Sequence, residues 1–154
     1  MVRELSKLTS AEQELVYKAP FLVSILIAGA DGKIDRTEIR EAIRFAEHSV
    51  VSSDLSLRQL MHEIATDFED KLRVLLQHYP RESASRNPML VEDLSQLNAV
   101  WSKLETKYAI DFYDLLINIA RHIAESSGGL MGIRSVGSEE ARYINLSMLQ
   151  KPDA

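Results

Sequence analysis

The chain has 154 residues and a mass of 17.4 kDa, and 45% of its residues are apolar, which suits one domain with a single core. Its six glycines and four prolines exclude collagen-like and low-complexity classes. The 18 basic and 23 acidic residues leave a net charge of −5, which disfavours nucleic acid as a partner, and the lack of cysteine excludes disulfides, thiolate metal sites and cysteine nucleophiles.

Residues 1–8 are charged and carry no apolar stretch followed by a cleavage site. We expect a disordered tail without a secretion signal, and the lack of cysteine is consistent with a cytoplasmic location. The longest apolar run, residues 19–30, is shorter than the about 20 residues that cross a bilayer, so no transmembrane segment is expected. This run predicts the central helix of a bundle, buried on every side.

Thr9 and Glu12 have the spacing of a capping box, in which each side chain accepts a hydrogen bond from the other residue's backbone N–H. A helix is therefore expected to begin near Ser10 and to run to about Gly29. Because Pro20 lies well inside this segment, it either kinks one helix or divides two.

A second capping pattern, with Asp35 as the N-cap and Glu38 three residues later, predicts that another helix follows at once. Its apolar positions are spaced by three and four residues: Ile39, Ala42, Ile43, Ala46 and Val50. This spacing puts them on a buried face and leaves the charged residues between them mostly in solvent.

Beyond residue 54, one apolar stripe continues over more than five helical turns. It comprises Leu57, Leu60, Met61, Ile64, Phe68, Leu72, Leu75 and Tyr79. The stripe predicts a long helix that Pro80 ends. Residues 80–88 are small and polar and lie between two prolines, which predicts a loop.

Two further stripes each predict a helix: Leu90, Leu94, Leu97, Trp101, Leu104 and Tyr108, and then Phe112, Leu115, Leu116, Ile119, Ala120 and Ile123. Residues 128–137 are rich in glycine and predict a connection. A short final helix is expected to open at Ser138 and to carry Ala141, Ile144 and Met148, with residues 150–154 as a tail.

No segment alternates with the two-residue period of a strand, so we expect an all-α, single-domain bundle of about six to seven helices over residues 1–154. Trp101 and Phe112 are expected in its core rather than stacked on a ligand. The oligomeric state stays open between a monomer and a homo-oligomer, because an outward apolar stripe has the same sequence pattern as a buried one.

Residues 28–38, AGADGKIDRTE, form an acidic turn between two predicted helices. Aligned with an EF-hand loop, Asp31 and Glu38 occupy positions five and twelve, but positions one and three are Ile27 and Gly29, which carry no carboxylate. The EF-hand interpretation therefore fails. Taken alone, these residues predict a glycine turn and a helix cap, which need no metal.

The four histidines match neither the Glu-x-x-His pairs of di-iron bundles nor the H-E-x-x-H motif of zinc proteases. His122 lies near Asn118 and Glu125 on the polar side of a predicted helix, where the three side chains can share a cation or remain solvated neighbours. The glycine-rich residues before Ser138 lead into a predicted helix N-terminus, which can bind an anion or simply follow a flexible connection.

The sequence A-D-G-K-I-D-x-x-E within residues 28–38, after a strongly apolar helix, resembles the first signature of the tellurite-resistance TerB family. That helical family includes the N-terminal region of a membrane-anchored DnaJ-type co-chaperone and is built from two weakly related halves. The place matching its second signature is residues 125–140, after the apolar segment 119–124. The resemblance covers about residues 15–150.

The resemblance implies a divalent-metal site, for Ca²⁺, Mg²⁺, Mn²⁺ or Zn²⁺, formed by Asp31, Glu38, Glu139 and Glu140. In the second half, Gly128-Gly129 and an insertion over residues 130–137 replace the Asp-Gly of the family. Because each lost carboxylate weakens a site for a hard cation, we expect weak metal binding.

For function, the resemblance implies a non-enzymatic bacterial module that acts in a stress or tellurite response and binds a protein partner. Two alternatives remain beside it. One is a metal-dependent enzyme that uses the acidic cluster as ligands and His122 as a base. The other is a structural adaptor that binds no ligand and whose acidic turns only cap helices.

Overall fold

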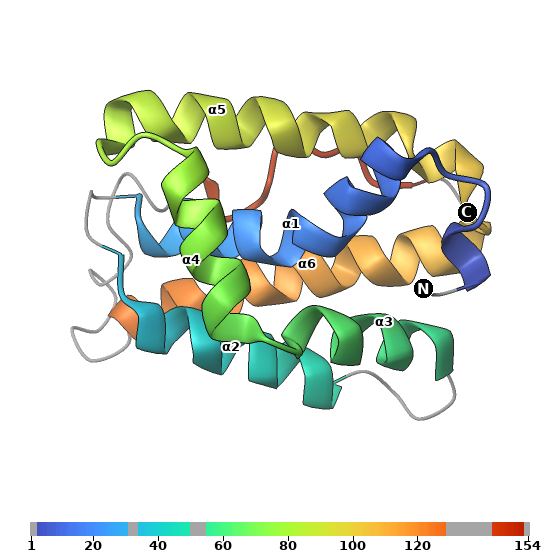
Figure 1. The fold of residues 1–154 in the computed structure, drawn as a ribbon, viewed down its shortest axis with the longest axis horizontal. Helices are drawn as coiled ribbons and strands as arrows, with labels where there is room; N and C mark the ends of the chain where they lie inside the picture. The colour runs from blue at the N-terminus through green and yellow to red at the C-terminus, as the bar shows by residue number, and fades with distance from the viewer. Residues whose placement is uncertain (1–2, 31–33, 50–54, 129–142, 153–154) are drawn as a thin grey trace.

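The computed structural model describes residues 3–30, 34–49, 55–128 and 143–152, and over these residues the chain is all-helical, with no strand (Figure 1). The α-helices are α1 (Ser10–Ala28), α2 (Arg36–Ser49), α3 (Leu55–Ala65), α4 (Phe68–His78), α5 (Ser83–Ser95) and α6 (Thr106–Gly128). Three short 3₁₀ helices accompany them: η1 (Arg3–Leu5), η2 (Gln96–Ala99) and η3 (Trp101–Lys103). The predicted all-α bundle is confirmed.

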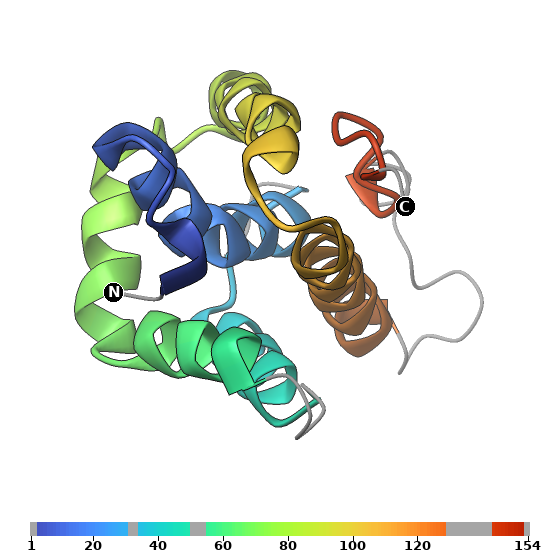
Figure 2. The same cartoon turned by 90° about the vertical axis from the view of Figure 1, so that its right-hand side faces the viewer.

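Helix α1 occupies the centre of the bundle, and the other helices surround it (Figure 2). It packs against α2, α3, α5 and α6. Every residue from 19 to 30 is buried, as the apolar run predicted. Because neighbours cover all sides of this segment, it needs no polar face, and the hydrophobic effect holds it at the centre. None of the described helices is both long and apolar enough to cross a membrane.

The predicted capping box begins α1. The backbone N–H of Glu12 donates to Thr9 Oγ1 over 3.2 Å, and the backbone N–H of Thr9 donates to Glu12 Oε1 over 2.9 Å. Pro20 lies inside one continuous helix, whose ribbon changes direction along its length (Figure 1). The chain is thus not divided there, although Pro20 removes one backbone donor from the helix.

We expect Thr9→Ala to lower the free energy of unfolding by about 1 kcal/mol, because it leaves the N–H of Glu12 without its cap. Urea denaturation followed by circular dichroism measures this change. Thr37→Ala is the control: Thr37 is exposed in the first turn of α2, and its side chain makes no hydrogen bond to another described residue. A loss of equal size in both variants would show that Thr9 does not act through the cap.

Helix α2 also begins as predicted. Asp35 Oδ1 accepts the backbone N–H groups of Thr37, over 2.9 Å, and of Glu38, over 3.3 Å. The apolar positions that the structure describes are all buried: Ile39, Ala42, Ile43 and Ala46. The fifth, Val50, lies outside the described residues.

The single long helix expected over residues 57–79 is wrong, because the chain breaks between α3 and α4. Asp67 adopts a left-handed conformation with φ 57°, which aspartate tolerates better than most residues. Lys71 Nζ donates to the carbonyl oxygens of Glu63, over 2.6 Å, and of Ile64, over 3.3 Å, near the end of α3. These bonds satisfy acceptors that a helix end leaves free.

The loop expected over residues 80–88 is also wrong, because α5 begins at Ser83 and continues through Pro88. Arg86 and Asn87, two polar residues of this segment, are buried. The side chain of Arg86 donates hydrogen bonds to Gly29 O and Arg81 O, so tertiary contacts hold this polar segment in the fold.

Tyr79 joins the end of α4 to α5, since its hydroxyl donates to Asp93 Oδ2 over 2.6 Å. Burial of the phenol, helped by the hydrogen bond and the charge of Asp93, raises the pKa of Tyr79 above its ordinary value. A raised pKa means that the folded state holds this proton more tightly than the unfolded state does.

The stabilisation from Tyr79 is therefore complete below about pH 10, the pKa of an unfolded tyrosine, and is lost as the pH rises toward the folded pKa. We expect Tyr79→Phe to lower the free energy of unfolding by about 1–2 kcal/mol near pH 7. The difference from wild type should shrink above pH 10. Urea denaturation over a pH series tests this, and a difference independent of pH would contradict it.

The stripe expected as one helix over residues 90–108 is divided among α5, η2, η3 and α6, with Leu104 in an extended conformation before α6. Trp101 and Phe112 lie in the core, as predicted. The break lets α6 turn back along α1 (Figure 2).

Residues 1–8 and 150–154 were predicted to be tails, but the residues of both segments that the structure describes contact the rest of the protein. Leu5 and Leu8 are buried in the core rather than disordered. At the other end, Trp101 Nε1 donates to Gln150 O over 2.9 Å, and Asn98 Oδ1 accepts the Gln150 N–H over 2.8 Å. Residues 144–152 are not helical, which corrects the final helix expected at Ile144 and Met148. The expected start of that helix and the connection after Gly128 lie outside the described residues.

Candidate functional site

The structure describes one of the four predicted metal ligands. Glu38 lies half-buried in the first turn of α2, next to the Asp35 cap. Asp31, Glu139 and Glu140 lie outside the described residues. Within the described ranges, no three histidine or acidic side chains are placed to share a metal ion. Of the predicted metal site, the described residues thus include Glu38 alone.

His122 is the expected base of the alternative hypothesis, a metal-dependent enzyme. Its ring face packs against the ring of Phe45 on α2. The two ring centroids are 4.3 Å apart and the planes differ by 10°. Asn118 and Glu125, the other members of the predicted polar group, are exposed on α6. The stacking gives His122 a role in joining α6 to α2. The glycine-rich anion site expected before Ser138 is not among the residues described.

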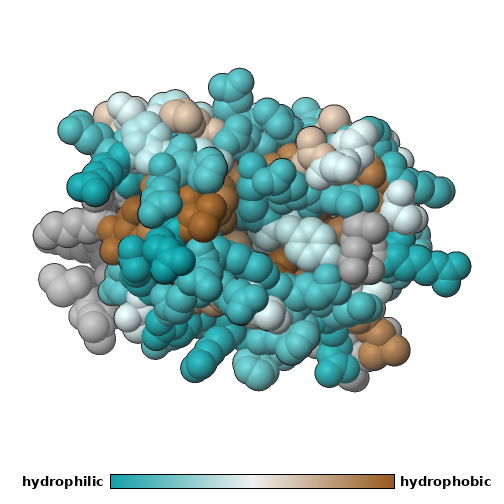
Figure 3. Space-filling model, in the orientation of Figure 1, coloured by the Kyte–Doolittle hydropathy of each residue, from teal (hydrophilic) through white to brown (hydrophobic). Residues whose placement is uncertain are grey.

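A surface feature that the sequence analysis did not predict is an apolar groove between α1 and α4, hereafter the α1–α4 groove. It has a volume of about 340 Å³. Its apolar lining is Phe21 from α1 with Val74 and Leu75 from α4. Figure 3 shows an apolar region beside α4 on a mostly hydrophilic face. Val74 is 45% exposed, so part of this lining meets solvent directly.

Charged residues of both signs border the α1–α4 groove: Glu14 and Lys18 on α1, and Asp70 and Lys71 on α4. An apolar centre with a polar, charged border is the usual composition of a protein interface. At 340 Å³ the groove lies at the lower end of the size range of ligand pockets, which suits one or a few inserted side chains.

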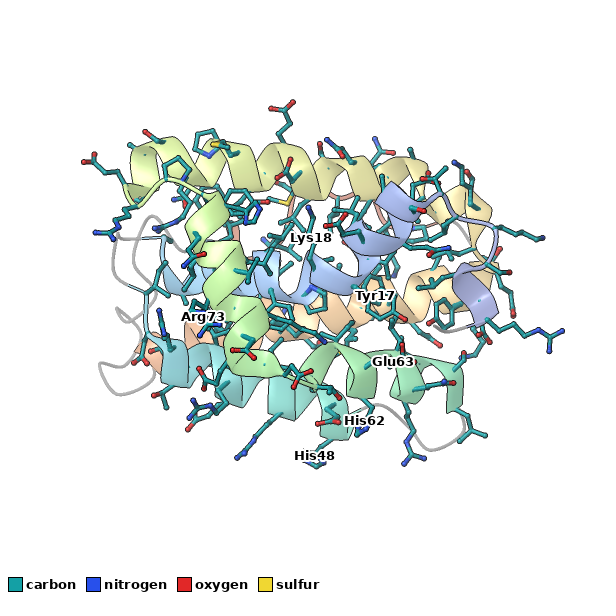
Figure 4. All side chains as sticks on the ribbon, in the orientation of Figure 1. Tyr17, Lys18, His48, His62, Glu63 and Arg73 are labelled. Carbon is teal, nitrogen blue, oxygen red and sulfur yellow. The ribbon has the colours of Figure 1, made fainter. Side chains whose placement is uncertain are left out.

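The groove is held in shape by Tyr17, whose hydroxyl donates to Glu63 Oε1 on α3 over 2.6 Å. Figure 4 shows Tyr17 and Glu63 facing one another, with Lys18 farther along α1. Below the groove, the ring of Phe21 stacks on Phe68 at a centroid distance of 5.6 Å. Hydrogen bonding and ring stacking thus hold Tyr17 and Phe21, two of the side chains that line the groove, against neighbouring helices.

Sequence reasoning missed the groove because Phe21 and Leu75 belong to the apolar run and the apolar stripe that predicted buried helix faces. The signal it had was Val74, which lies outside the predicted stripe of residues 57–79 and is an apolar residue on the exposed side. Single exposed apolar residues are common, so Val74 alone does not identify a site.

Comparison with known proteins adds no relative: no family model matches the chain, and neither a curated protein nor a solved structure matches it. The resemblance to the TerB family therefore rests on the sequence motifs alone.

Proposed function

We propose that this chain is a non-enzymatic, TerB-like helical module that binds a protein partner through the α1–α4 groove. The observation that supports this function is the exposed apolar lining at Val74, bordered by charges of both signs and backed by fixed side chains. The partner inserts an apolar side chain over Phe21 and Val74 and pairs its own charges with those at the border.

The test compares two substitutions at equally exposed apolar positions. Val74→Glu places a charge in the groove, whereas Met89→Glu, at a residue 43% exposed on α5, places one elsewhere. Proteins captured by the wild-type chain are identified, and the affinity of each purified candidate is measured. We expect Val74→Glu to weaken the specific partner at least tenfold, about 1.4 kcal/mol, because a charge would be buried against apolar surface.

Met89→Glu should leave that affinity unchanged. Because both positions are exposed, neither substitution should alter the circular dichroism spectrum. Equal affinity of the Val74→Glu variant and the wild type would exclude the groove as the interface, whatever proteins are captured.

The resemblance to TerB also supports a proposal of weak divalent-metal binding at Asp31, Glu38, Glu139 and Glu140, in a stress or tellurite response. Calorimetric titration with Ca²⁺, Mg²⁺, Mn²⁺ and Zn²⁺ tests it by comparing wild type with Asp31→Ala/Glu38→Ala. Glu41→Ala/Glu92→Ala, at two exposed positions, is the control with the same change in charge.

Binding heat that is lost only in Asp31→Ala/Glu38→Ala supports the metal site. Absence of heat in all proteins favours the structural adaptor, an alternative supported by the capping of α2 by Asp35. The metal-dependent enzyme with His122 as its base stays a second alternative, and the same titration tests its metal site.

A further inference from the structure

A second pocket opens where α4 leads into α5, and four arginines line it: Arg36, Arg73, Arg81 and Arg86. We call it the arginine pocket. The four arginines come from the start of α2, from α4, from the link between α4 and α5, and from the first turn of α5. Its volume is about 880 Å³. Among the residues that the structure describes, the rest of the lining is uncharged: Ile34, Leu76, Gln77, Tyr79 and Pro80.

Arg86 is the buried member of this group, with 2% of its surface exposed. Its Nη1 donates to Arg81 O over 2.8 Å and its Nη2 donates to Gly29 O over 2.6 Å. Its Nε is buried and has no hydrogen-bond partner among the described residues. Both acceptors are neutral carbonyl groups, so the described contacts orient the guanidinium without neutralising its charge.

The position of Arg86 in its helix adds to the positive potential in the arginine pocket. It lies in the first turn of α5, where the partial charge of a helix is positive and favours anions over cations. Burial lowers the pKa of Arg86 from its ordinary value, as expected for a desolvated cation. An arginine nevertheless stays protonated in proteins, so the charge persists.

The remaining arginines can also turn toward an anion. Arg36 and Arg81 are exposed, and no ion pair with a described carboxylate is recorded for either. Arg73 pairs with Asp70 over 3.0 Å, but both side chains are more than half exposed. Exposed pairs of this kind contribute little, so an anion of higher charge can compete for Arg73.

We propose that the arginine pocket binds a small molecule that carries a phosphate or diphosphate group. Guanidinium groups match the oxygens of phosphate in pairs of parallel hydrogen bonds. An anion with two or more negative charges neutralises the positive charge of several arginines better than a single carboxylate does. Ile34 and Leu76 offer apolar contact to the organic part of such a ligand. This inference is independent of the proposed α1–α4 interface.

The test uses calorimetric titration with sodium pyrophosphate, inorganic phosphate, phenyl phosphate and citrate at constant ionic strength. The altered protein is Arg36→Ala/Arg81→Ala, which removes two exposed charges from the pocket. Arg44→Ala/Arg58→Ala removes two exposed charges from α2 and α3 outside it. The two double variants have the same net charge. A difference in affinity between them therefore comes from the arginine pocket and not from the net charge of the protein.

We expect wild type and Arg44→Ala/Arg58→Ala to bind pyrophosphate with equal affinity, and Arg36→Ala/Arg81→Ala to bind it at least about tenfold more weakly. Tighter binding of phenyl phosphate than of inorganic phosphate indicates an organic ligand, and the reverse order indicates free phosphate. Arg81→Gln repeats the test with one substitution should the double variant fold poorly.

Three results would overturn the proposal. The first is no binding of any phosphate compound by the wild type. The second is unchanged affinity in Arg36→Ala/Arg81→Ala. The third is binding of citrate as tight as that of pyrophosphate, which would show an unselective attraction of anions.

Discussion

Phe112→Ala is expected to lower the free energy of unfolding by about 4 kcal/mol, within the range measured for buried phenylalanines. The Phe112 side chain is fully buried in α6 and meets the ring of Trp101 edge-on, with centroids 6.4 Å apart. Alanine would leave a cavity that the surrounding helices cannot fill, because close-packed side chains relax only partly. Since domains have total stabilities of only about 5–15 kcal/mol, the variant should be close to unfolding.

Urea denaturation followed by circular dichroism measures this loss. Phe45→Ala is the matched control, since Phe45 is partly exposed and its main ring contact is the stack on His122. We expect that variant to lose about 1 kcal/mol. Equal losses in the two variants would show that Phe112 is not in a tightly packed core.

Gly29→Ala is expected to lower the free energy of unfolding by about 3 kcal/mol, the upper part of the range for overpacked sites. The backbone of Gly29, with φ −102°, is open to alanine, so the cost is steric. A Cβ atom there would lie 2.5 Å from Arg86 Nη2, 2.8 Å from Ile34 Cγ1 and 2.9 Å from Ile25 O. The Ile25 carbonyl belongs to the central helix, so it cannot move away.

A double-mutant cycle with Arg86→Ala measures how much of this loss in the free energy of unfolding comes from the contact with Arg86. Because Arg86→Ala removes the nearest atom, Gly29→Ala should cost less in that background than in wild type. Denaturation of the four proteins gives the coupling energy. A neutral or stabilising Gly29→Ala would contradict the predicted close approach, since replacing glycine at an unhindered position usually stabilises by about 0.4–1 kcal/mol.

Local signals in the sequence were reliable where the structure depends on residues three or four apart. The capping box at Thr9 and the cap at Asp35 fixed the beginnings of α1 and α2. The apolar run 19–30 correctly indicated a helix buried on all sides. In each case the interacting groups are neighbours along the chain, so their spacing is enough to predict the bond or the buried face.

The division of the longer stripes could not be predicted in the same way. One continuous helix and two helices packed on the same core have apolar residues at the same spacing. What separates α3 from α4 is the left-handed Asp67, together with the bonds from Lys71 to the end of α3. The polar segment beginning at Ser83 is helical, and its Arg86 donates to the carbonyl oxygen of Gly29, 57 residues earlier in the chain, a contact that no local pattern predicts.

By itself, the sequence determined the helical class, the central position of residues 19–30 and the starts of the first two long helices, because these follow from local spacing and apolar content. Tertiary structure alone decided where the longer stripes break and which distant residues meet. The α1–α4 groove joins Phe21 to Val74, and the arginine pocket joins Arg36 to Arg86. Such surfaces form only when helices distant in the chain pack together, so no local pattern specifies them.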